Sequence, residues 1–293
     1  MESTSWWDRI ERGAKSLFWV AFLIMFLTQA YAPLRLEAAR LEVLHRLEEA
    51  HHSRAIALIH RQESISLIGI PIARYIDIDD SEAILRAIRL TPDDQPIDLV
   101  LHTPGGLVLA AEQIAQALAA HKGKVTVFVP HYAMSGGTLL ALAANTIVMD
   151  PNAVLGPVDP QLGEYPAASL VKLREWKTPD KISDKMLVLS DISAKALVQV
   201  QNFVSALLVA RMPELQAEAL AKALSEGRWT HDFPITVSLA REFGLSVSTD
   251  MPKLIYELMD LYHQAAPQRP GVLYTERRPG RKPDQMPASS RGP

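Results

Sequence analysis

Two glycine-rich turns hold the residues of this sequence that are best suited to chemistry. They are LHTPGG (101–106) and YAMSGGT (132–138), and each follows a predicted strand and precedes a predicted helix. At such a turn the first N–H groups of the helix lack partners, and glycine allows another group to approach the backbone closely. We therefore expect N–H groups of Gly105 or Gly106 and of Gly136 to converge on one oxygen atom, as an oxyanion hole requires.

Ser135 stands in the second turn, where the following helix begins. A hydroxyl group at that position lies where the helix dipole favours developing negative charge, which suits a nucleophile. A serine that only caps the helix occupies the same position. The sequence contains no cysteine, so a thiol nucleophile, disulfides and thiolate zinc sites are excluded. A Walker phosphate loop is disfavoured because no lysine follows the glycines.

The segments around these turns alternate between short apolar strands and helices. The expected strands are 55–59, 65–68, 97–102, 125–129 and 146–149, and the expected helices between them are 79–90, 107–121 and 135–144. This alternation predicts an α/β fold with a mainly parallel sheet. Helices over 182–211, 213–226, 236–243 and 254–265 are expected to follow.

Residues 98–163 resemble the core of the Clp protease and signal peptide peptidase A superfamily, which has a crotonase-like fold of repeated β-β-α units. The closest resemblance is to its membrane-associated branch, the serine dehydrogenase proteinase family. It rests on three ordered segments within residues 54–262, which are 99–118, 125–170 and 228–245. It implies that Ser135 is the nucleophile, that Gly136 supplies one oxyanion N–H group, and that Gly105 and Gly106 supply the other. The family name does not imply hydride transfer, because no Gly-x-Gly-x-x-Gly nucleotide loop is present.

The general base is the point where this sequence departs from the Clp pattern. In the Clp relatives a histidine follows the nucleophile by about 25 residues, and here Asp159 lies near that place. The peptidase A relatives use a serine–lysine dyad, in which burial lowers the pKa of the lysine. By that resemblance we predict Lys195 as the base, followed by Lys185 and Lys172. The alternative for Lys195 is an exposed ion pair with Asp191, four residues earlier.

Four further residues are candidates for the site. His231 is an alternative base, because a histidine titrates near neutral pH. Asp232 follows it directly, but consecutive side chains rarely reach the same partner. His102 and His131 flank the glycine turns and, with Asp159, are expected to line the site; a structural role is the alternative for both histidines. The spacing of histidine and carboxylate residues indicates no metal site, and no cofactor is expected.

The N-terminal region contains an unbroken apolar run at 17–27. We predict a flank at 1–15, a transmembrane anchor at 16–34, an amphipathic helix or linker at 35–53, a peptidase domain at 54–265 and a disordered basic, proline-rich tail at 266–293. A signal peptide cleaved after Ala30-Tyr31-Ala32 is the alternative to the anchor. Equal numbers of basic residues on the two sides leave the membrane orientation open.

The net charge of −3 gives no argument for nucleic-acid binding. Taken together, these features predict a serine peptidase held in the cell membrane by a single span. Its expected partners are an extended peptide or membrane-protein segment as substrate, membrane lipid, and further copies of itself. A non-catalytic peptide-binding scaffold is the alternative function, and an acyl-thioester enzyme is a third.

Overall fold

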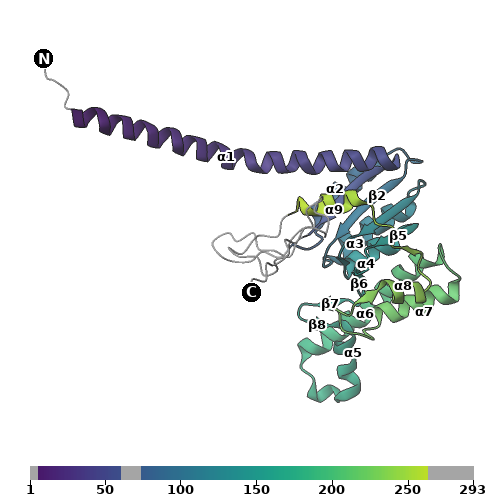
Figure 1. The fold of residues 1–293 in the computed structure, drawn as a ribbon. Coiled ribbons are helices and arrows are strands. Elements are labelled where there is room, and N and C mark those ends of the chain that lie inside the picture. Colours follow the sequence, from purple (N-terminus) through teal and green to yellow (C-terminus); the bar gives the residue numbers. More distant parts are fainter. Residues whose placement is uncertain (1–5, 61–73, 263–293) are drawn as a thin grey trace, which may run out of the picture.

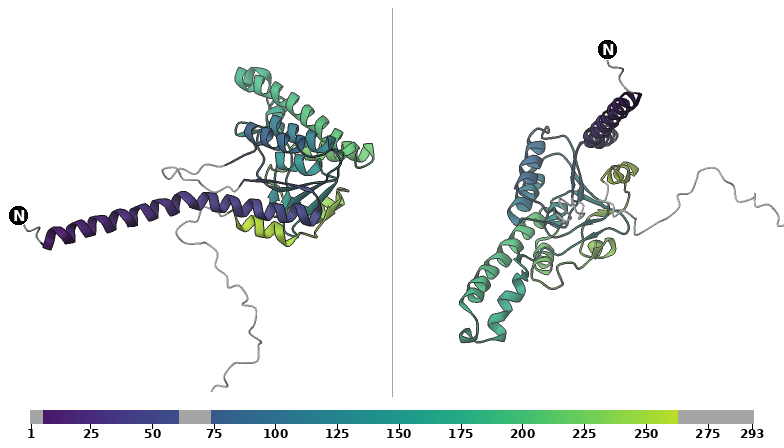
Figure 2. Two further views of the ribbon diagram at one scale, coloured as in Figure 1. Left: turned by 90° about the horizontal axis from the view of Figure 1, so that it is seen from above. Right: turned by 90° about the vertical axis from the view of Figure 1, so that its left-hand side faces the viewer.

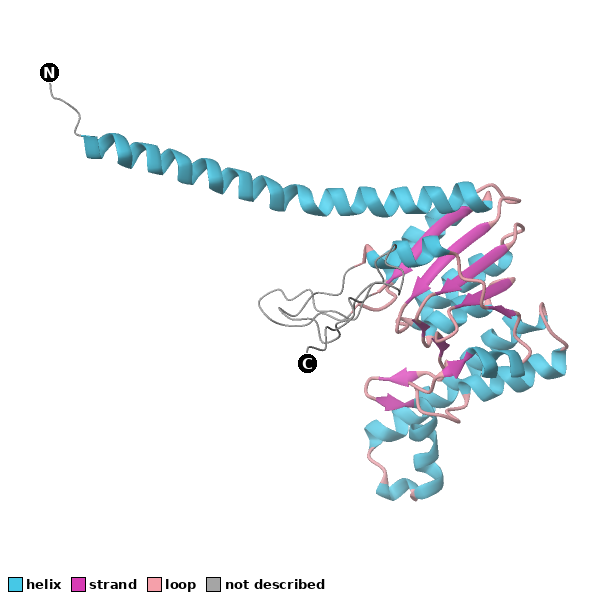
Figure 3. Ribbon diagram, in the orientation of Figure 1, coloured by secondary structure: helices cyan, strands magenta, loops and turns pink. Residues whose placement is uncertain are grey.

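A five-stranded parallel sheet forms the centre of the molecule. The structure is a computed structural model that describes residues 6–60 and 74–262. The strand expected at 65–68 and the tail expected at 266–293 lie outside these residues. The strand order is β1-β2-β3-β5-β10, and every neighbouring pair is parallel (Figures 1 and 3). The strands are β1 (Arg54–Ile59), β2 (Ile97–His102), β3 (Val125–Val129), β5 (Thr146–Met149) and β10 (Val247–Ser248).

Helices cover both faces of this sheet, because alternate residues of its central strands are apolar on both faces. Leu99 and Leu101 of β2 face a cluster that includes α2 (Ile78–Arg89), α3 (Val108–Ala120) and α4 (Gly136–Leu142). Val100, between them, faces a second cluster with the end of α1 (Trp6–His51) and with α9 (Lys253–Asp260). The predicted α/β fold with a parallel sheet is thus confirmed, and the strand at 55–59 and the helices at 79–90 and 107–121 lie within a residue or two of their predicted ends.

A second, three-stranded sheet consists of very short strands, which are β4 (Tyr132–Ala133), β6 (Val154–Leu155) and β9 (Ile235–Thr236). The sequence predicts a turn at Tyr132 and Ala133, and this is wrong, because these residues form β4, which pairs in parallel with β6. A two-residue strand is too short to show any hydrophobic periodicity. β3, β4 and α4 follow one another as a strand–strand–helix unit, so both glycine turns lead out of strands and into helices.

The remaining helices follow the second sheet in the chain. A small hairpin, β7 (Gln161–Leu162) and β8 (Tyr165–Pro166), leads into α5 (Ala167–Trp176) and the 3₁₀ turn η1 (Pro179–Lys181). The chain then forms α6 (Asp184–Val209), α7 (Glu214–Ser225) and α8 (Val237–Glu242). In Figures 1 and 2, α5 and the first half of α6 form an arm that projects away from the sheet.

Helix α1 is continuous over 46 residues, with Pro33 inside it, and is therefore about 69 Å long at 1.5 Å per residue. Its apolar segment at 17–27 is exposed along its length and extends away from the domain (Figure 2). Its C-terminal part packs on β1 and α9, where the Arg40 guanidinium donates to the Leu261 carbonyl at 2.9 Å. By length and composition, α1 from Gly13 and α6 are both apolar enough to cross a membrane, although α6 is partly buried in the domain.

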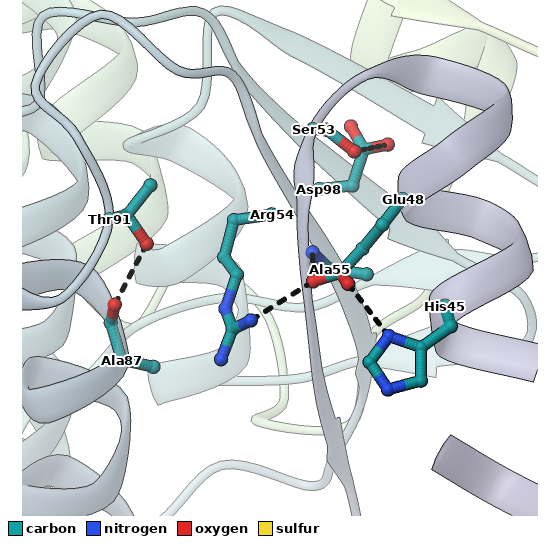
Figure 4. Close-up of polar contacts among 8 residues, drawn as sticks. All are labelled: His45, Glu48, Ser53, Arg54, Ala55, Ala87, Thr91 and Asp98. Atoms are coloured by element: carbon teal, nitrogen blue, oxygen red, sulfur yellow. Dashed lines mark hydrogen bonds and ion pairs between the residues drawn. The ribbon is translucent and has the colours of Figure 1, made fainter. Parts of the chain in front are cut away.

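Hydrogen bonds at the C-terminal end of α1 connect this part of the chain to the sheet (Figure 4). The Glu48 carboxylate accepts hydrogen bonds from the Ala55 N–H at 3.1 Å and from Arg54 at 3.3 Å. The buried Asp98 carboxylate of β2 accepts from the Ser53 hydroxyl at 2.9 Å. The amphipathic part of α1 therefore packs on its own domain, as the apolar spacing of residues 34–50 predicts.

Candidate active site

The two glycine turns lie side by side at the carboxyl edge of the central sheet. Thr103, which follows β2, forms an isolated parallel bridge with Ala133 of β4. Its N–H group donates to the Tyr132 carbonyl at 3.2 Å, and its carbonyl accepts from the Met134 N–H at 2.9 Å. These backbone bonds hold the two turns in register, and they bring Ser135 next to Gly105 and Gly106.

Ser135 has an unusual backbone conformation, with φ of 51° and ψ of −117°. A non-glycine residue in such a region costs of order 1–3 kcal/mol and is typical of functional sites. The Ser135 side chain makes no capping hydrogen bond to helix α4. It therefore does not act as the simple N-cap that the sequence leaves open.

The neighbouring glycines leave no room for a side chain. Gly105 has φ of +105°, and a Cβ atom added there would lie 2.7 Å from the Ser135 Cβ. A Cβ added to Gly136 would lie 2.9 Å from the Ala111 Cβ and 3.6 Å from the Gly106 nitrogen. The backbones of the two turns therefore approach each other directly beside Ser135.

The N–H groups of the three glycines have different roles. The Gly105 N–H donates to the Thr103 hydroxyl oxygen at 3.2 Å. Within residues 6–60 and 74–262, the N–H groups of Gly106 and Gly136 donate no hydrogen bond. Both glycines line the same cavity as Ser135. The geometry thus leaves Gly106 and Gly136 free to bind an oxyanion and gives Gly105 a structural role.

This cavity has a volume of about 510 Å³ and lies beside Ser135. Besides Ser135, its polar side chains are those of Asp159, Gln161, His231 and Asp232. Its apolar or backbone lining comes from Tyr75, Pro104, Gly106, Val108, Met134, Gly136, Leu139, Val158, Pro160 and Val200. A mainly apolar cavity with a few convergent polar groups is typical of a ligand or active site.

A histidine and a carboxylate are paired in the wall of this cavity. His231 Nδ1 lies 2.9 Å from Asp159 Oδ1, and the Gln161 side-chain amide donates to Asp159 Oδ2 at 2.7 Å. The Asp159 side chain is buried, whereas a third of the His231 side chain is exposed. Both carboxylate oxygens are thus occupied, and Nε2 is the ring nitrogen of His231 that remains for a partner in the cavity.

This pairing is not predicted from the sequence. His231 is expected as an alternative base and Asp159 as a lining residue, and the two lie 72 positions apart. Gln161 is not expected at all, although residues i and i+2, such as Asp159 and Gln161, share a side of an extended segment. Asp232 lines the cavity but is not the partner of His231, in keeping with the expectation for consecutive side chains.

The predicted lysines lie elsewhere. Lys195 pairs with Asp191 at 2.5 Å, and 69% of its side chain is exposed. Lys185 and Lys172 are exposed on the arm formed by α5 and α6. In the part of the chain that the structure describes, no lysine lines the cavity beside Ser135.

The two predicted lining histidines are neighbours but do not line the cavity. His102 is buried at the end of β2, and its ring centroid lies 4.2 Å from that of Tyr132. His131 is exposed and stacks on His102 at 5.7 Å. Their contacts indicate a structural role beneath the glycine turns. Among the described residues no group of three histidine, aspartate or glutamate side chains is arranged to bind a metal ion.

The amino-acid sequence matches a known protein family over nearly its whole length. A match to the family described as ClpP-like SDH-type serine proteinase extends over residues 5–289. The chain belongs to this family. Two proteins of Methanocaldococcus jannaschii are similar to it, and both are described as uncharacterized. MJ0137 is 56% identical over 258 residues, which cover 88% of this chain and 90% of that protein. MJ1495 is 51% identical over 256 residues, which cover 86% and 87%.

Solved structures with a partly similar architecture include two proteases. The 1510-N membrane-bound stomatin-specific protease, in a serine-to-alanine form, is 21% identical and has a TM-score of 0.43, with 64% of this chain and 79% of that chain covered. ClpP1 from Listeria monocytogenes is 15% identical and has a TM-score of 0.44, with 71% and 98% covered. The predicted membership of the ClpP-like serine dehydrogenase-type proteinases is confirmed by the family match.

Proposed function

We propose that this chain is a membrane-anchored serine peptidase with Ser135 as nucleophile and His231 as general base. The single observation that carries the proposal is the cavity in which Ser135, the free N–H groups of Gly106 and Gly136, and the His231–Asp159 pair all meet. A nucleophile, a base oriented by a carboxylate, and two oxyanion donors are the groups that acyl transfer needs. His231 replaces Lys195 in this proposal because Lys195 is exposed and bonded to Asp191.

In the proposed reaction each of these groups has one role. His231 Nε2 takes the Ser135 hydroxyl proton while Oγ attacks the peptide carbonyl carbon, and the N–H groups of Gly106 and Gly136 bind the resulting oxyanion. Asp159, which accepts from Nδ1, holds the ring in the tautomer with Nε2 unprotonated and stabilises the imidazolium ion that forms. The imidazolium then protonates the leaving amine. Water, activated by the same nitrogen, hydrolyses the acyl-enzyme and regenerates the Ser135 hydroxyl.

The substrate in this proposal is an extended peptide or a segment of a membrane protein. The mainly apolar lining of the cavity favours apolar side chains next to the scissile bond. An extended peptide can also bind by adding a strand to a neighbouring sheet, in which case backbone hydrogen bonds supply affinity. The protease 1510-N has been solved, in a lysine-to-alanine form, in complex with a substrate peptide.

A serine-directed fluorophosphonate probe tests the assignment of the nucleophile. The full chain in detergent should be labelled at Ser135, as identified by mass spectrometry, and should hydrolyse peptides. S135A should lose both properties, whereas S238A, which alters an exposed serine of α8, should keep both. Labelling at another serine, or full hydrolysis by S135A, would refute the proposal. Peptide binding without labelling or hydrolysis would favour the non-catalytic scaffold.

The proposal places the protein in the cell membrane, attached through α1. The support is the exposed apolar segment at 17–27 and its rigid continuation into a helix that is bonded to the domain. Removal of residues 1–33 should release the protein from liposomes in a flotation assay, and removal of residues 1–5 should not. Equal flotation of the two truncated proteins would contradict the anchor.

Self-association is part of the same proposal. Trp176, Val188 and Val198 expose large apolar side chains on α5 and α6, and exposed apolar surface of this kind often marks a protein interface. Light scattering of the detergent-solubilised chain should give a mass of at least two copies. A monomeric mass at micromolar concentration would contradict this part.

A further inference from the structure

Four polar groups form a hydrogen-bonded chain behind the first glycine turn. Asp80 Oδ2 lies 3.2 Å from His60 Nε2, and His60 Nδ1 lies 3.0 Å from the Thr103 hydroxyl oxygen. The Thr103 hydroxyl oxygen in turn accepts the Gly105 N–H at 3.2 Å. His60 and Thr103 are buried. None of the four residues lines the cavity beside Ser135.

The Thr103 hydroxyl has two acceptors within reach, His60 Nδ1 at 3.0 Å and the Gly105 carbonyl oxygen at 3.4 Å, and we take the shorter contact as its hydrogen bond. Burial raises the pKa of Asp80, but hydrogen bonds from His60 and from the Asp77 backbone outweigh it, so that the pKa lies below its ordinary value. In the tautomer that carries its proton on Nε2, His60 donates to the Asp80 carboxylate, and Nδ1 accepts from the Thr103 hydroxyl. The Thr103 oxygen then keeps its lone pairs for the Gly105 N–H. Asp80 thereby sets the orientation of the Thr103 hydroxyl through the His60 tautomer.

A second contact fixes the other side of the same glycine. The Gly105 carbonyl accepts from the Ile76 N–H at 2.7 Å, and the Ile76 carbonyl accepts from the Leu107 N–H at 2.8 Å. In a trans peptide the C=O and N–H groups point in opposite directions. Because the Gly105 carbonyl points at Ile76, the Gly106 N–H in the same peptide unit points away from Ile76.

Both contacts originate at the beginning of helix α2. Asp77 and Asp80 form a capping box there, in which each carboxylate accepts the other residue's N–H at 3.0 Å. Ile76 directly precedes this box, and His60 bonds to its Asp80 carboxylate. Gly105 has φ of +105°, a conformation that side chains disfavour. Its N–H group is held by Thr103, through His60 and Asp80, and its carbonyl is held by Ile76, so both contacts lead back to the start of α2.

We propose that His60, through Thr103, is a positioning residue that holds the Gly106 N–H in the direction required for oxyanion binding. The inference rests on the proposed serine peptidase function and deepens it. His60 touches neither Ser135 nor the bound carbonyl. It acts by fixing the Pro104–Gly105 peptide unit, which adjoins the Gly105–Gly106 unit that Ile76 holds. Its effect belongs to the transition state, because the oxyanion exists only after Ser135 has attacked.

Thr103 offers a closely matched pair of variants. T103V keeps the methyl group that packs near Gly137 but loses the hydroxyl, whereas T103S keeps the hydroxyl and loses the methyl. T91V serves as the control, because Thr91 is also a buried threonine, and its hydroxyl donates to the Ala87 carbonyl at the C-terminal end of α2, away from His60 (Figure 4). All variants are made in the full chain, and kcat, KM, Tm and the rate of fluorophosphonate labelling at Ser135 are measured.

T103V should lower kcat and the labelling rate about tenfold to a hundredfold with KM nearly unchanged, since loss of a whole oxyanion donor costs about 10²–10³-fold. T103S should restore most of the rate. T91V should lower Tm but leave kcat within about twofold. H60Q should act like T103V, and the double variant H60Q/T103V should be no slower than T103V alone, because both changes break one chain.

The outcomes separate this inference from the function on which it rests. An active, Ser135-labelled wild type together with a T103V variant that loses only Tm would overturn the inference alone. Equal losses of kcat in T103V and T103S would also overturn it, because packing would then explain the effect. A wild type that neither hydrolyses peptides nor reacts at Ser135 would overturn the function and the inference together.

Discussion

The role of Asp159 can be tested by a substitution that preserves its shape. The carboxylate is 2% exposed and accepts from His231 Nδ1 at 2.9 Å, so D159N removes a buried, charged hydrogen bond. Such a bond is worth about 1.5–3 kcal/mol, which is about a tenfold to 150-fold change in kcat. The amide also donates to Nδ1 and so forces the proton onto Nε2, the nitrogen that must accept from Ser135. With that tautomer effect we expect a total loss of about 10²–10⁴-fold in kcat.

The assay is peptide hydrolysis by the full chain, with circular dichroism melting to verify that each variant is folded. D232N is the matched control, because Asp232 lines the same cavity and lies beside His231 but is exposed and does not bond to it. It should keep kcat within about threefold. A D159N variant with more than a tenth of the wild-type kcat, or with the same loss as D232N, would refute the assignment of the His231–Asp159 pair.

Three further predictions follow from other contacts. K195M should leave kcat within about twofold and stability within about 1 kcal/mol, because the ion pair with Asp191 is exposed; loss of labelling at Ser135 in this variant would restore the serine–lysine dyad. G105A should lower stability by about 2–4 kcal/mol and abolish labelling, because φ of +105° and the nearby Ser135 Cβ oppose a side chain; an unchanged urea midpoint would contradict this. Burial and the hydrogen bond to Asp150 raise the pKa of Tyr256 from 10.0 to about 12. A raised pKa contributes stability that is complete below pH 10 and is lost between pH 10 and 12, so Y256F should flatten the urea stability profile in that window, and an identical profile would contradict this.

The sequence predicts four of the five strands of the central sheet, because these strands are mostly buried, and it misses the two-residue edge strand β10. Segments 97–102 and 125–129 are mainly apolar and are bounded by polar turns, and both are strands at these positions. The short strands of the second sheet lack such a signal. Two residues of β4 or β6 contribute no periodicity, and their pairing depends on contacts between parts of the chain that are distant in sequence.

Helix α5 shows a different reason why prediction from sequence is incomplete. Residues 167–176 carry two exposed basic side chains and an exposed tryptophan, and only three of the ten residues are buried. The apolar face of α5 is therefore weak, and its packing against α6 stabilises it. The long helix α6 has a much stronger apolar pattern, and the sequence predicts it to within two residues at each end.

The candidate site separates in the same way into local and distant parts. The glycine turns and Ser135 are readable because strand, turn and helix follow one another within a few residues. The His231–Asp159 pair cannot be predicted from the sequence, because His231 precedes β9 and Asp159 follows β6. Only folding brings His231 Nδ1 within 2.9 Å of Asp159 Oδ1. The lysines on α6 have the residue type that a dyad requires, yet the helix presents them to solvent.

The order of these groups along the chain has a physical explanation. General-base catalysis requires a histidine nitrogen beside the nucleophile and a carboxylate on the other ring nitrogen, and nothing in that requirement fixes which residue comes first in sequence. Here Asp159 lies 24 residues after Ser135, near the place where the Clp relatives carry their histidine, and His231 comes later, near their acid. The two side chains line the same cavity and bond to each other. The same hydrogen bond forms whichever of the two residues comes first in the sequence. H231N should therefore lose activity as completely as D159N, and the double variant H231N/D159N should be no worse than H231N alone. Additive losses in that cycle would mean that the two residues act separately and that another group serves as the base.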